Sequence, residues 1–369
     1  MYMKSSTRNL GIDILRILSM LGVVFLHVLG HGGILYLDHT PVNFSMVWFF
    51  EVLTYPAVNC FVLISGYVGY KDNVISPKIK NLLSLMFTVT FYSISIYLVL
   101  AYSGIIPFEL NAFVKNFFPT MYKNYWFFSA YFGMFLLSPL LNLLVQHLSL
   151  KYALAFLSVL LFLGTGPTTY DAFTLTEGYS MIWLVFIYLT GAIIKKFKLN
   201  ELLSKKWWLI IALTAFLITW ISKIAFHYSS ITYFNNRSNL LIKYVSPTII
   251  IMAVALLCLF SKIKCNPSLA KIISFFASST FSVYLIHDNN YIRNHLMSKI
   301  HTFIDSYDFI YLTLFIIFMV LAVFVTCILI DKIRIVIFKI LKIEKLSVGI
   351  EGLIRKAVNT VYLALEKKM

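Results

Sequence analysis

Long apolar stretches, separated by short polar segments, fill most of the 369-residue chain. A transmembrane helix needs about 20 consecutive apolar residues, because the helix rises about 1.5 Å per residue and the hydrocarbon core is about 30 Å thick. By that length, the pattern predicts an all-α integral membrane protein with about ten transmembrane helices in a single domain. The helices are expected near residues 10–30, 45–70, 80–103, 125–146, 151–167, 179–195, 206–226, 244–261, 271–288 and 309–331.

The composition agrees with a lipid environment. Apolar residues make up 60% of the chain and charged residues 12%, whereas an ordinary soluble domain carries about 25% charged residues. In a soluble protein, the net charge of +16 would suggest nucleic-acid binding. Here no soluble domain remains outside the apolar stretches to present such a surface. We therefore expect the lipid bilayer, and no nucleic acid, as a partner.

The distribution of basic residues predicts the orientation of the chain. With the N-terminus inside, 23 of the 31 lysines and arginines fall in cytoplasmic segments and 7 in outer loops, and Arg16 remains within the first span. Cytoplasmic loops of membrane proteins are enriched in Lys and Arg. We therefore expect a multi-pass protein of the cell membrane, as in a bacterial plasma membrane, with both termini cytoplasmic and loops 31–44 and 165–178 outside.

The C-terminal segment is basic and partly amphipathic. We divide the chain into a transmembrane domain, residues 1–331, and a cytoplasmic tail, residues 332–369. Such a tail is typical of a helix that lies on an anionic membrane surface. A partner-binding role for the tail is the alternative.

Three ionisable residues, Asp13, Arg16 and His27, lie within the first predicted span. Ionisable groups are costly inside a bilayer and usually mark function. At about 100° per residue, Arg16 and His27 fall within about 20° of the same helix face, and Asp13 is one turn from Arg16. The alternative is purely structural: Asp13 and Arg16 form an ion pair, and His27 is a hydrogen-bonded interior histidine. The shared face, which links the inner side to the outer half, favours function.

A second histidine, His287, ends the ninth predicted span in the segment SSTFSVYLIHDNN. Counted from the inner ends of their spans, His27 and His287 lie at similar depth, toward the outer face. His31 follows His27 by one turn, which is a spacing compatible with a two-histidine metal pair. The sequence shows no obvious further ligand nearby, and we expect no metal.

Two further pairs of residues lie where substrates could bind. Ser65 and Gly66 are near the inner end of the second span, level with Arg16, and small residues allow a helix or a ligand to approach closely. Tyr125 and Trp126 open the fourth span, where an interfacial aromatic belt is expected. Aromatic rings at this position can also stack on a sugar ring.

Four segments resemble motifs of the type-3 membrane acyltransferase family, in the order in which that family has them. The segment RNLGIDILRILSMLGVVFLHV contains the family's hallmark, an Arg followed by ten residues and a His. CFVLISGY resembles its second-span FFxxSG element, NYWFFSAYFGMFLLSPLLN its Trp-led fourth span, and SVYLIH its late Tyr-Leu-x-His element. The resemblance covers residues 8–330.

The resemblance implies transfer of an acyl group, by default acetyl, from cytoplasmic acyl-CoA to a hydroxyl of a cell-envelope or exported polysaccharide. It implies catalytic roles for Arg16, Asp13, His27 and His287. A hydroxyl is a poor nucleophile at neutral pH, and a neutral imidazole such as that of His27 can accept its proton. Arg16 would hold the charged part of CoA, with Asp13 orienting it. An acyl-His27 intermediate is the alternative mechanism.

The remaining expected site residues follow from the same resemblance. Ser65 and Gly66 are expected at the acyl-CoA, and Tyr125, Trp126 and Tyr284 at the glycan acceptor. Acetyl-CoA is expected as a co-substrate, and polysaccharide-synthesis proteins are further expected partners.

The chain departs from the family in the fourth span. Many polysaccharide O-acyltransferases carry a Glu there, whereas this chain has the segment Ser129–Phe132. That departure puts an acid role in the fourth span in doubt. Three other carboxylates near outer span ends are expected to be solvated: Glu51, Asp171 and Glu177.

A transporter or flippase for a glycan or lipid-linked glycan is the alternative function, with the intramembrane charges forming a substrate path. Transporters often carry inverted repeats and helices broken at matching positions, and no such pairing is visible in the sequence. A structural protein without chemistry would leave the shared face of Arg16 and His27 unexplained.

Overall fold

The computed structural model describes residues 9–71, 79–122, 124–165 and 174–366, which form helices and connecting turns without a β-strand. Six helical segments in this part of the chain are long and apolar enough to cross a membrane. The all-helical membrane architecture is therefore confirmed, whereas the expected count of ten spans is not. The six segments are Leu10–Leu29, Pro41–Gly69, Ile79–Tyr102, Trp126–His147, Lys205–His227 and Phe309–Ile340.

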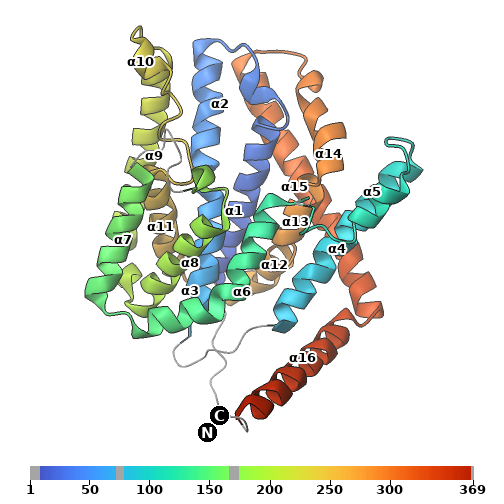
Figure 1. Cartoon of the computed structure of the whole chain (residues 1–369). Coiled ribbons are helices and arrows are strands. Elements are labelled where there is room, and N and C mark those ends of the chain that lie inside the picture. Colours follow the sequence, from blue (N-terminus) through green and yellow to red (C-terminus); the bar gives the residue numbers. More distant parts are fainter. Residues whose placement is uncertain (1–8, 72–78, 123, 166–173, 367–369) are drawn as a thin grey trace.

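Helix α1 (Leu10–Leu29) lies at the centre of the bundle (Figure 1), in contact with helices on several sides. The Asn9 side chain accepts a hydrogen bond from the backbone N–H of Ile12 and caps its first turn. Gly22 brings α1 close to α3, because a Cβ at this position would lie 3.1 Å from the Cβ of Ala57. The helix that carries the predicted catalytic face is therefore held from several directions.

The second predicted span is a pair of helices, α2 (Pro41–Thr54) and α3 (Ala57–Gly69), separated by a turn. Helix α3 packs closely on α8 (Met181–Lys196). A Cβ at Gly66 would lie only 2.0 Å from the carbonyl oxygen of Tyr188 on α8. Gly66, which we expected at the acyl-CoA, therefore serves the contact between these two helices.

The ninth predicted span, residues 271–288, is broken into α12 (Ala270–Ala277) and α13 (Thr280–His287). At the break, the Lys332 amino group donates hydrogen bonds to the hydroxyl oxygens of Ser278 and Ser279, and to a carbonyl oxygen of α12 at 2.6 Å. A cation from α15 thus binds polar groups on both sides of the break, since Ser278 follows the end of α12 and Ser279 precedes α13. The expectation of one unbroken helix over this range is not met.

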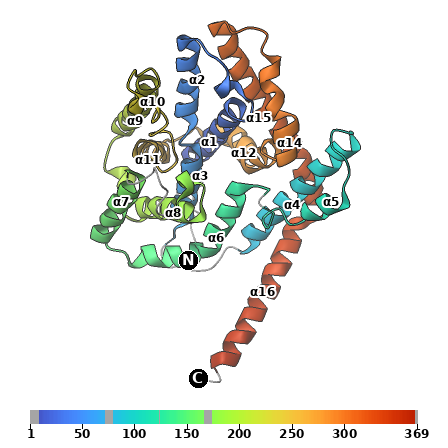
Figure 2. The same cartoon turned by 45° about the horizontal axis from the view of Figure 1, so that its top comes forward.

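The C-terminal part of the chain consists of α15 (Phe309–Ile340) and α16 (Ile343–Glu366). Helix α15 continues beyond residue 331, where we expected the tail to begin. Helix α16 projects away from the bundle (Figure 2), and an ion pair of 2.6 Å between Glu344 and Lys80 ties its start to α4 (Ile79–Tyr102). The tail helix therefore has a defined contact with the transmembrane part.

The other α-helices of the described residues are α5 (Leu110–Lys115), α6 (Trp126–His147), α7 (Leu150–Thr165), α9 (Lys205–His227), α10 (Thr232–Asn235), α11 (Pro247–Ser261) and α14 (Asn290–His295). Short 3-10 helices are η1 (Ile34–Tyr36), η2 (Thr176–Gly178), η3 (Leu199–Glu201), η4 (Pro267–Leu269) and η5 (Met297–Phe303).

Candidate active site

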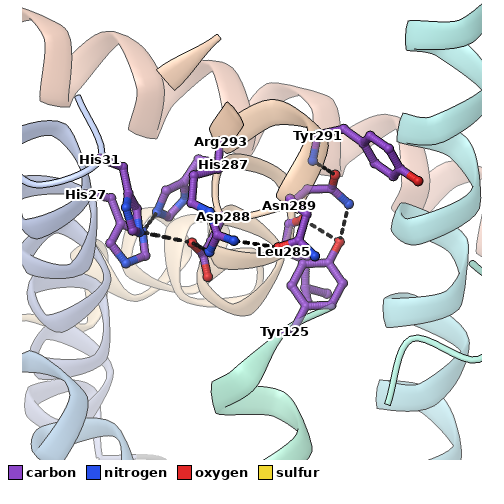
Figure 3. A network of polar contacts seen from close by, with 10 residues as sticks. His27, His31, Tyr125, Leu285, His287, Asp288, Asn289, Tyr291 and Arg293 are labelled. Carbon is purple, nitrogen blue, oxygen red and sulfur yellow. Dashed lines mark hydrogen bonds and ion pairs between the residues drawn. The ribbon is translucent and has the colours of Figure 1, made fainter. Parts of the chain in front are cut away.

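Two histidines from distant parts of the chain meet at the end of α1 (Figure 3). Nδ1 of His27 lies 2.9 Å from Nε2 of His287, and Nδ1 of His287 lies 2.6 Å from the Val283 carbonyl oxygen. A carbonyl only accepts, so Nδ1 of His287 carries a hydrogen. With both imidazoles neutral, Nε2 of His287 then accepts a hydrogen bond from Nδ1 of His27. This arrangement leaves Nε2 of His27 unprotonated and able to take up a proton.

Asp288, which sequence reasoning missed, is the carboxylate beside these histidines. Its side chain is buried, and Oδ1 lies 3.7 Å from Nδ1 of His27, 3.5 Å from Nε2 of His31 and 3.5 Å from Nη1 of Arg293. A carboxylate at this distance stabilises the imidazolium that forms when His27 accepts a proton. Asp288 directly follows His287 in the sequence. Helix α13 ends at His287, and because Asp288 lies just beyond that end, its side chain can face α1 beside the histidine.

The same cluster has the spacing of a metal site. His27, His31 and Asp288 each offer one ligand atom, and these atoms lie within 4.8 Å of one another. Two histidines and a carboxylate are a frequent zinc ligand set, so the expectation that no further ligand lies near the histidines was wrong. Nδ1 of His27 is already hydrogen-bonded to His287. The absence of a metal requirement stays a prediction.

A cavity of about 560 Å³, here called the Arg16 cavity, opens beside the first part of α1. The predicted ion pair is present, since Nη1 of Arg16 donates to Oδ1 of the buried Asp13 at 2.6 Å. Ser65 also lines this cavity, as expected from its level, and its hydroxyl lies 3.2 Å from that of Tyr131. The cavity gathers four basic side chains from separate segments: Arg16, Lys71, Lys80 and Arg355.

A second cavity, of about 730 Å³, lies at the other end of α1 and is here called the His27 chamber. Glu51 lines it and is 7% exposed, so the expectation of a solvated carboxylate was wrong. Glu177 is more exposed and forms an ion pair of 2.8 Å with Lys243, while Asp171 lies outside the described residues. Aromatic side chains form much of the wall: Tyr36, Trp48, Tyr55, Trp126, Tyr179 and Tyr244.

A small apolar cavity of about 30 Å³, here called the apolar passage, lies along α1 between these two cavities. Met20 and Val23 line it from the stretch of α1 that separates Arg16 from His27. Phe127 and Phe281 line it from α6 and α13. His27 lines both the passage and the chamber, and so stands where they meet.

The three aromatic residues expected at the acceptor have different surroundings. Trp126 lines the His27 chamber, with its ring centroid 4.5 Å from that of Tyr179. Tyr284 is buried and lines the apolar passage. Tyr125 is 1% exposed, and its hydroxyl donates to the Leu285 carbonyl and accepts from Asn289 (Figure 3). Tyr125 therefore fastens α6 to α13 and does not belong to an interfacial aromatic belt.

A family model for the acyltransferase domain of acyltransferase family 3 matches residues 9–331. The chain belongs to acyltransferase family 3. A search of curated proteins and a search of solved structures returned no match. The family match favours a membrane acyltransferase over a transporter.

In this family 3 acyltransferase, the matched range 9–331 includes all residues that line the apolar passage and the His27 chamber, and most of those that line the Arg16 cavity. Arg355, from α16, lies beyond the matched range but lines the Arg16 cavity. The acyltransferase therefore has a basic cavity at one end of α1 and an aromatic chamber at the other. The base candidate, His27, lies at the chamber end of the apolar passage.

Proposed function

We propose that this membrane acyltransferase transfers an acetyl group from cytoplasmic acetyl-CoA to a hydroxyl group of an envelope or exported polysaccharide. The supporting observation is the position of His27, which lines both the apolar passage and the His27 chamber. A base at this point meets an acyl donor that arrives through the passage and an acceptor that binds in the chamber. The two substrates then need not share one aqueous compartment.

The Arg16 cavity is the proposed site of the CoA part of the donor. Basic side chains from four segments line it, and a guanidinium binds phosphate through several fixed N–H donors. The buried Asp13 holds one of the Arg16 donors at 2.6 Å and orients the rest of the guanidinium. With both termini cytoplasmic, as the distribution of Lys and Arg predicts, this cavity would open to the cytoplasm.

The chemical step proposed at His27 begins with the acceptor hydroxyl. Its oxygen forms a bond to the carbonyl carbon of the thioester while its proton moves to Nε2 of His27. The C–S bond then breaks, and the imidazolium returns the proton to the departing sulfur, so that free CoA and the acetyl ester are released. His287 accepts a hydrogen bond from Nδ1 of His27 and so keeps this nitrogen protonated. The Asp288 carboxylate stabilises the transient positive charge.

The dimensions of the passage support a short acyl group. His27 lies eleven positions after Arg16 on α1, which corresponds to about 16 Å along the helix. The pantetheine arm of CoA can follow this route only if side chains that line it, Met20 and Phe127 among them, move apart. The passage itself, at about 30 Å³, has room for about two water molecules, which favours acetyl over longer acyl groups.

The test uses purified protein in proteoliposomes, radiolabelled acetyl-CoA and a polysaccharide fraction of the cell envelope. We expect His27→Ala to lower the transfer of label by about 10²–10⁴-fold, the usual contribution of a general base. The control is His295→Ala, because His295 is half-buried on α14, lines none of the three cavities, and among the described residues hydrogen-bonds a backbone carbonyl of its own helix. Near-normal acetylation by a correctly inserted His27→Ala protein would overturn the assignment.

A further inference from the structure

We propose that Glu51, on α2, is a specificity-determining residue that binds neighbouring hydroxyl groups of a neutral sugar ring together with Trp48. The inference rests on the proposed function, because it takes the His27 chamber as the acceptor site. Both residues line this chamber and stand one helical turn apart, so that they share one part of its wall.

The first argument is that both side chains carry a buried polar atom without a partner. Glu51 is 7% and Trp48 is 9% exposed. Within the described residues, neither Oε2 of Glu51 nor Nε1 of Trp48 has a hydrogen-bond partner. Buried polar groups are nearly always hydrogen-bonded, because an unsatisfied group keeps the full cost of its lost hydration. An acceptor and a donor are therefore available to a ligand at the same wall.

The basic side chain that acts electrostatically on Glu51, Lys223, does not satisfy its carboxyl group. Lys223 of α9 places its amino group over the Trp48 ring, 3.8 Å from the ring centroid, and donates to Oδ1 of Asn239 at 2.7 Å. No ion pair joins Lys223 to Glu51 in the described part of the chain. Lys223 thus supports the Trp48 ring and leaves Oε2 of Glu51 for another donor.

The chemistry of the two atoms points to hydroxyl groups. A hydroxyl both donates and accepts, so one can donate to Glu51 while its neighbour accepts from the indole N–H of Trp48. Around them, aromatic rings offer flat apolar surfaces, including Trp126 and Tyr179 at a centroid distance of 4.5 Å. A mostly aromatic wall with a few fixed polar groups is typical of a small-molecule site. A sugar ring presents both hydroxyl groups and an apolar C–H face.

The charges of the chamber favour a neutral sugar over an acidic one. Its basic side chains, Lys243 and Arg293, are each in an ion pair, at 2.8 Å with Glu177 and at 3.5 Å with Asp288. Among the described residues that line the chamber, no basic side chain is therefore left without a carboxylate partner. The basic side chain close to Glu51, Lys223, does not line the chamber and already donates to Ser238 and Asn239, so a sugar carboxylate or phosphate beside Glu51 would lack a basic partner of its own. We therefore expect uronic acids and phosphorylated sugars to bind poorly.

The experiment measures binding by isothermal titration calorimetry on the purified full-length protein in detergent. The probes are the methyl glycosides of glucose, galactose, mannose and N-acetylglucosamine, compared with methyl glucuronide as the acidic probe and methyl glucosaminide as the basic probe. We expect at least one neutral glycoside to bind at least tenfold more tightly than the glucuronide.

The variants Glu51→Gln and Glu51→Leu test the residue itself. The first keeps the shape but replaces a carboxyl oxygen with an amide nitrogen, which can only donate, and we expect about tenfold weaker binding of the neutral glycoside. The second removes the acceptor, and we expect about 100-fold weaker binding. Glu109→Gln is the control, because this carboxylate is exposed and lines neither the His27 chamber, the apolar passage nor the Arg16 cavity. We expect it to change binding less than twofold.

Acetyl-CoA binding, measured on the same samples, reports that each variant is folded. The inference is overturned if no neutral glycoside binds, if either charged probe binds more tightly than all neutral ones, or if folded Glu51→Gln binds like the parent. Failure of the proposed function has a different signature. In that case the neutral glycosides bind and depend on Glu51, but no acetyl group reaches them from acetyl-CoA.

Discussion

His27 and His287 are 260 positions apart in the sequence, yet Nδ1 of the first lies 2.9 Å from Nε2 of the second. The contact joins α1 to α13, and the Val283 carbonyl fixes which nitrogen of His287 carries a hydrogen. The pair therefore determines which nitrogen of His27 is free to accept a proton. Removing one member should change proton transfer before it changes substrate binding.

Replacing His287 tests whether its hydrogen bond fixes the tautomer of His27. We expect His287→Phe to lower the turnover of acetyl transfer by at least about tenfold, because His27 loses the acceptor that fixes its tautomer. His287→Gln keeps an acceptor oxygen and should recover part of the rate. The KM for acetyl-CoA should be unchanged in both. Equal losses in the two variants would mean that His287 acts through packing alone.

Arg16 is expected to serve the acyl donor and not the acceptor. Arg16→Ala should weaken acetyl-CoA binding by at least about tenfold, since a charge-assisted hydrogen bond is lost, while binding of a neutral glycoside stays within twofold. Arg16→Lys keeps the charge but not the planar arrangement of donors, so acetyl transfer should still fall sharply. Calorimetry with the two ligands separates these effects. If Arg16→Ala binds acetyl-CoA as tightly as the parent, Arg16 is only a partner of Asp13.

We expect Arg355 to extend the proposed donor site into α16. Its side chain lines the Arg16 cavity and pairs with Glu351 at 2.7 Å on the same helix. Because it is partly exposed, we expect a modest effect, with Arg355→Ala raising the KM for acetyl-CoA by about threefold to tenfold. Lys356→Ala, at the exposed neighbouring position, is the control and should leave the KM unchanged. Identical behaviour of the two variants would remove α16 from the donor site.

Met20 is expected to limit the length of the acyl group. It lines the apolar passage of about 30 Å³, and shortening it to alanine enlarges the space available to the acyl chain. We expect Met20→Ala to raise the rate with hexanoyl-CoA relative to acetyl-CoA by about tenfold. An apolar pocket typically discriminates by about this factor or more for one methylene group of its substrate. Met252→Ala removes a similarly buried methionine elsewhere and should not change this ratio. An unchanged ratio in Met20→Ala would place acyl selection elsewhere.

The predicted orientation can be tested by labelling single cysteines in intact cells. Tyr36, in the loop after α1 that we expect outside, is a suitable site because it is 78% exposed. A membrane-impermeant maleimide should label Tyr36→Cys from outside and should label Leu202→Cys only after the cells are opened. Labelling of Leu202→Cys in intact cells would reverse the topology.

The sequence was most informative where a relationship lies within one helix. The common face of Arg16 and His27 and the pairing of Asp13 with Arg16 depend only on helical periodicity. The ion pair is present, and Arg16 and His27 each line a cavity together with residues of α3 and α6. The similar depth of His27 and His287 followed from counting residues along two spans, and these side chains are in contact. Within one element, geometry leaves little freedom.

Features that depend on another helix could not be predicted in this way. The break between α12 and α13 involves Lys332, more than fifty residues later in the chain. Tyr125 turns inward because its hydroxyl finds partners on α13 and at Asn289. Glu51 has the position of a solvated carboxylate in the sequence, and only packing around α2 buries it. In each case a tertiary neighbour decides the outcome.

In the predicted orientation, the apolar passage would also separate two aqueous cavities that open to opposite sides of the membrane. A continuous water column from Arg16 to His27 would conduct protons, yet the side chains of Met20, Phe127 and Phe281 leave only about 30 Å³ between the two cavities. Water-filled cavities on both sides would shorten the insulating layer to this stretch of side chains, so the electrical potential of the membrane would fall mainly across it. Enlarging the passage would then cost the cell part of its proton gradient, which sets an upper bound on how wide an acyl route this fold can tolerate.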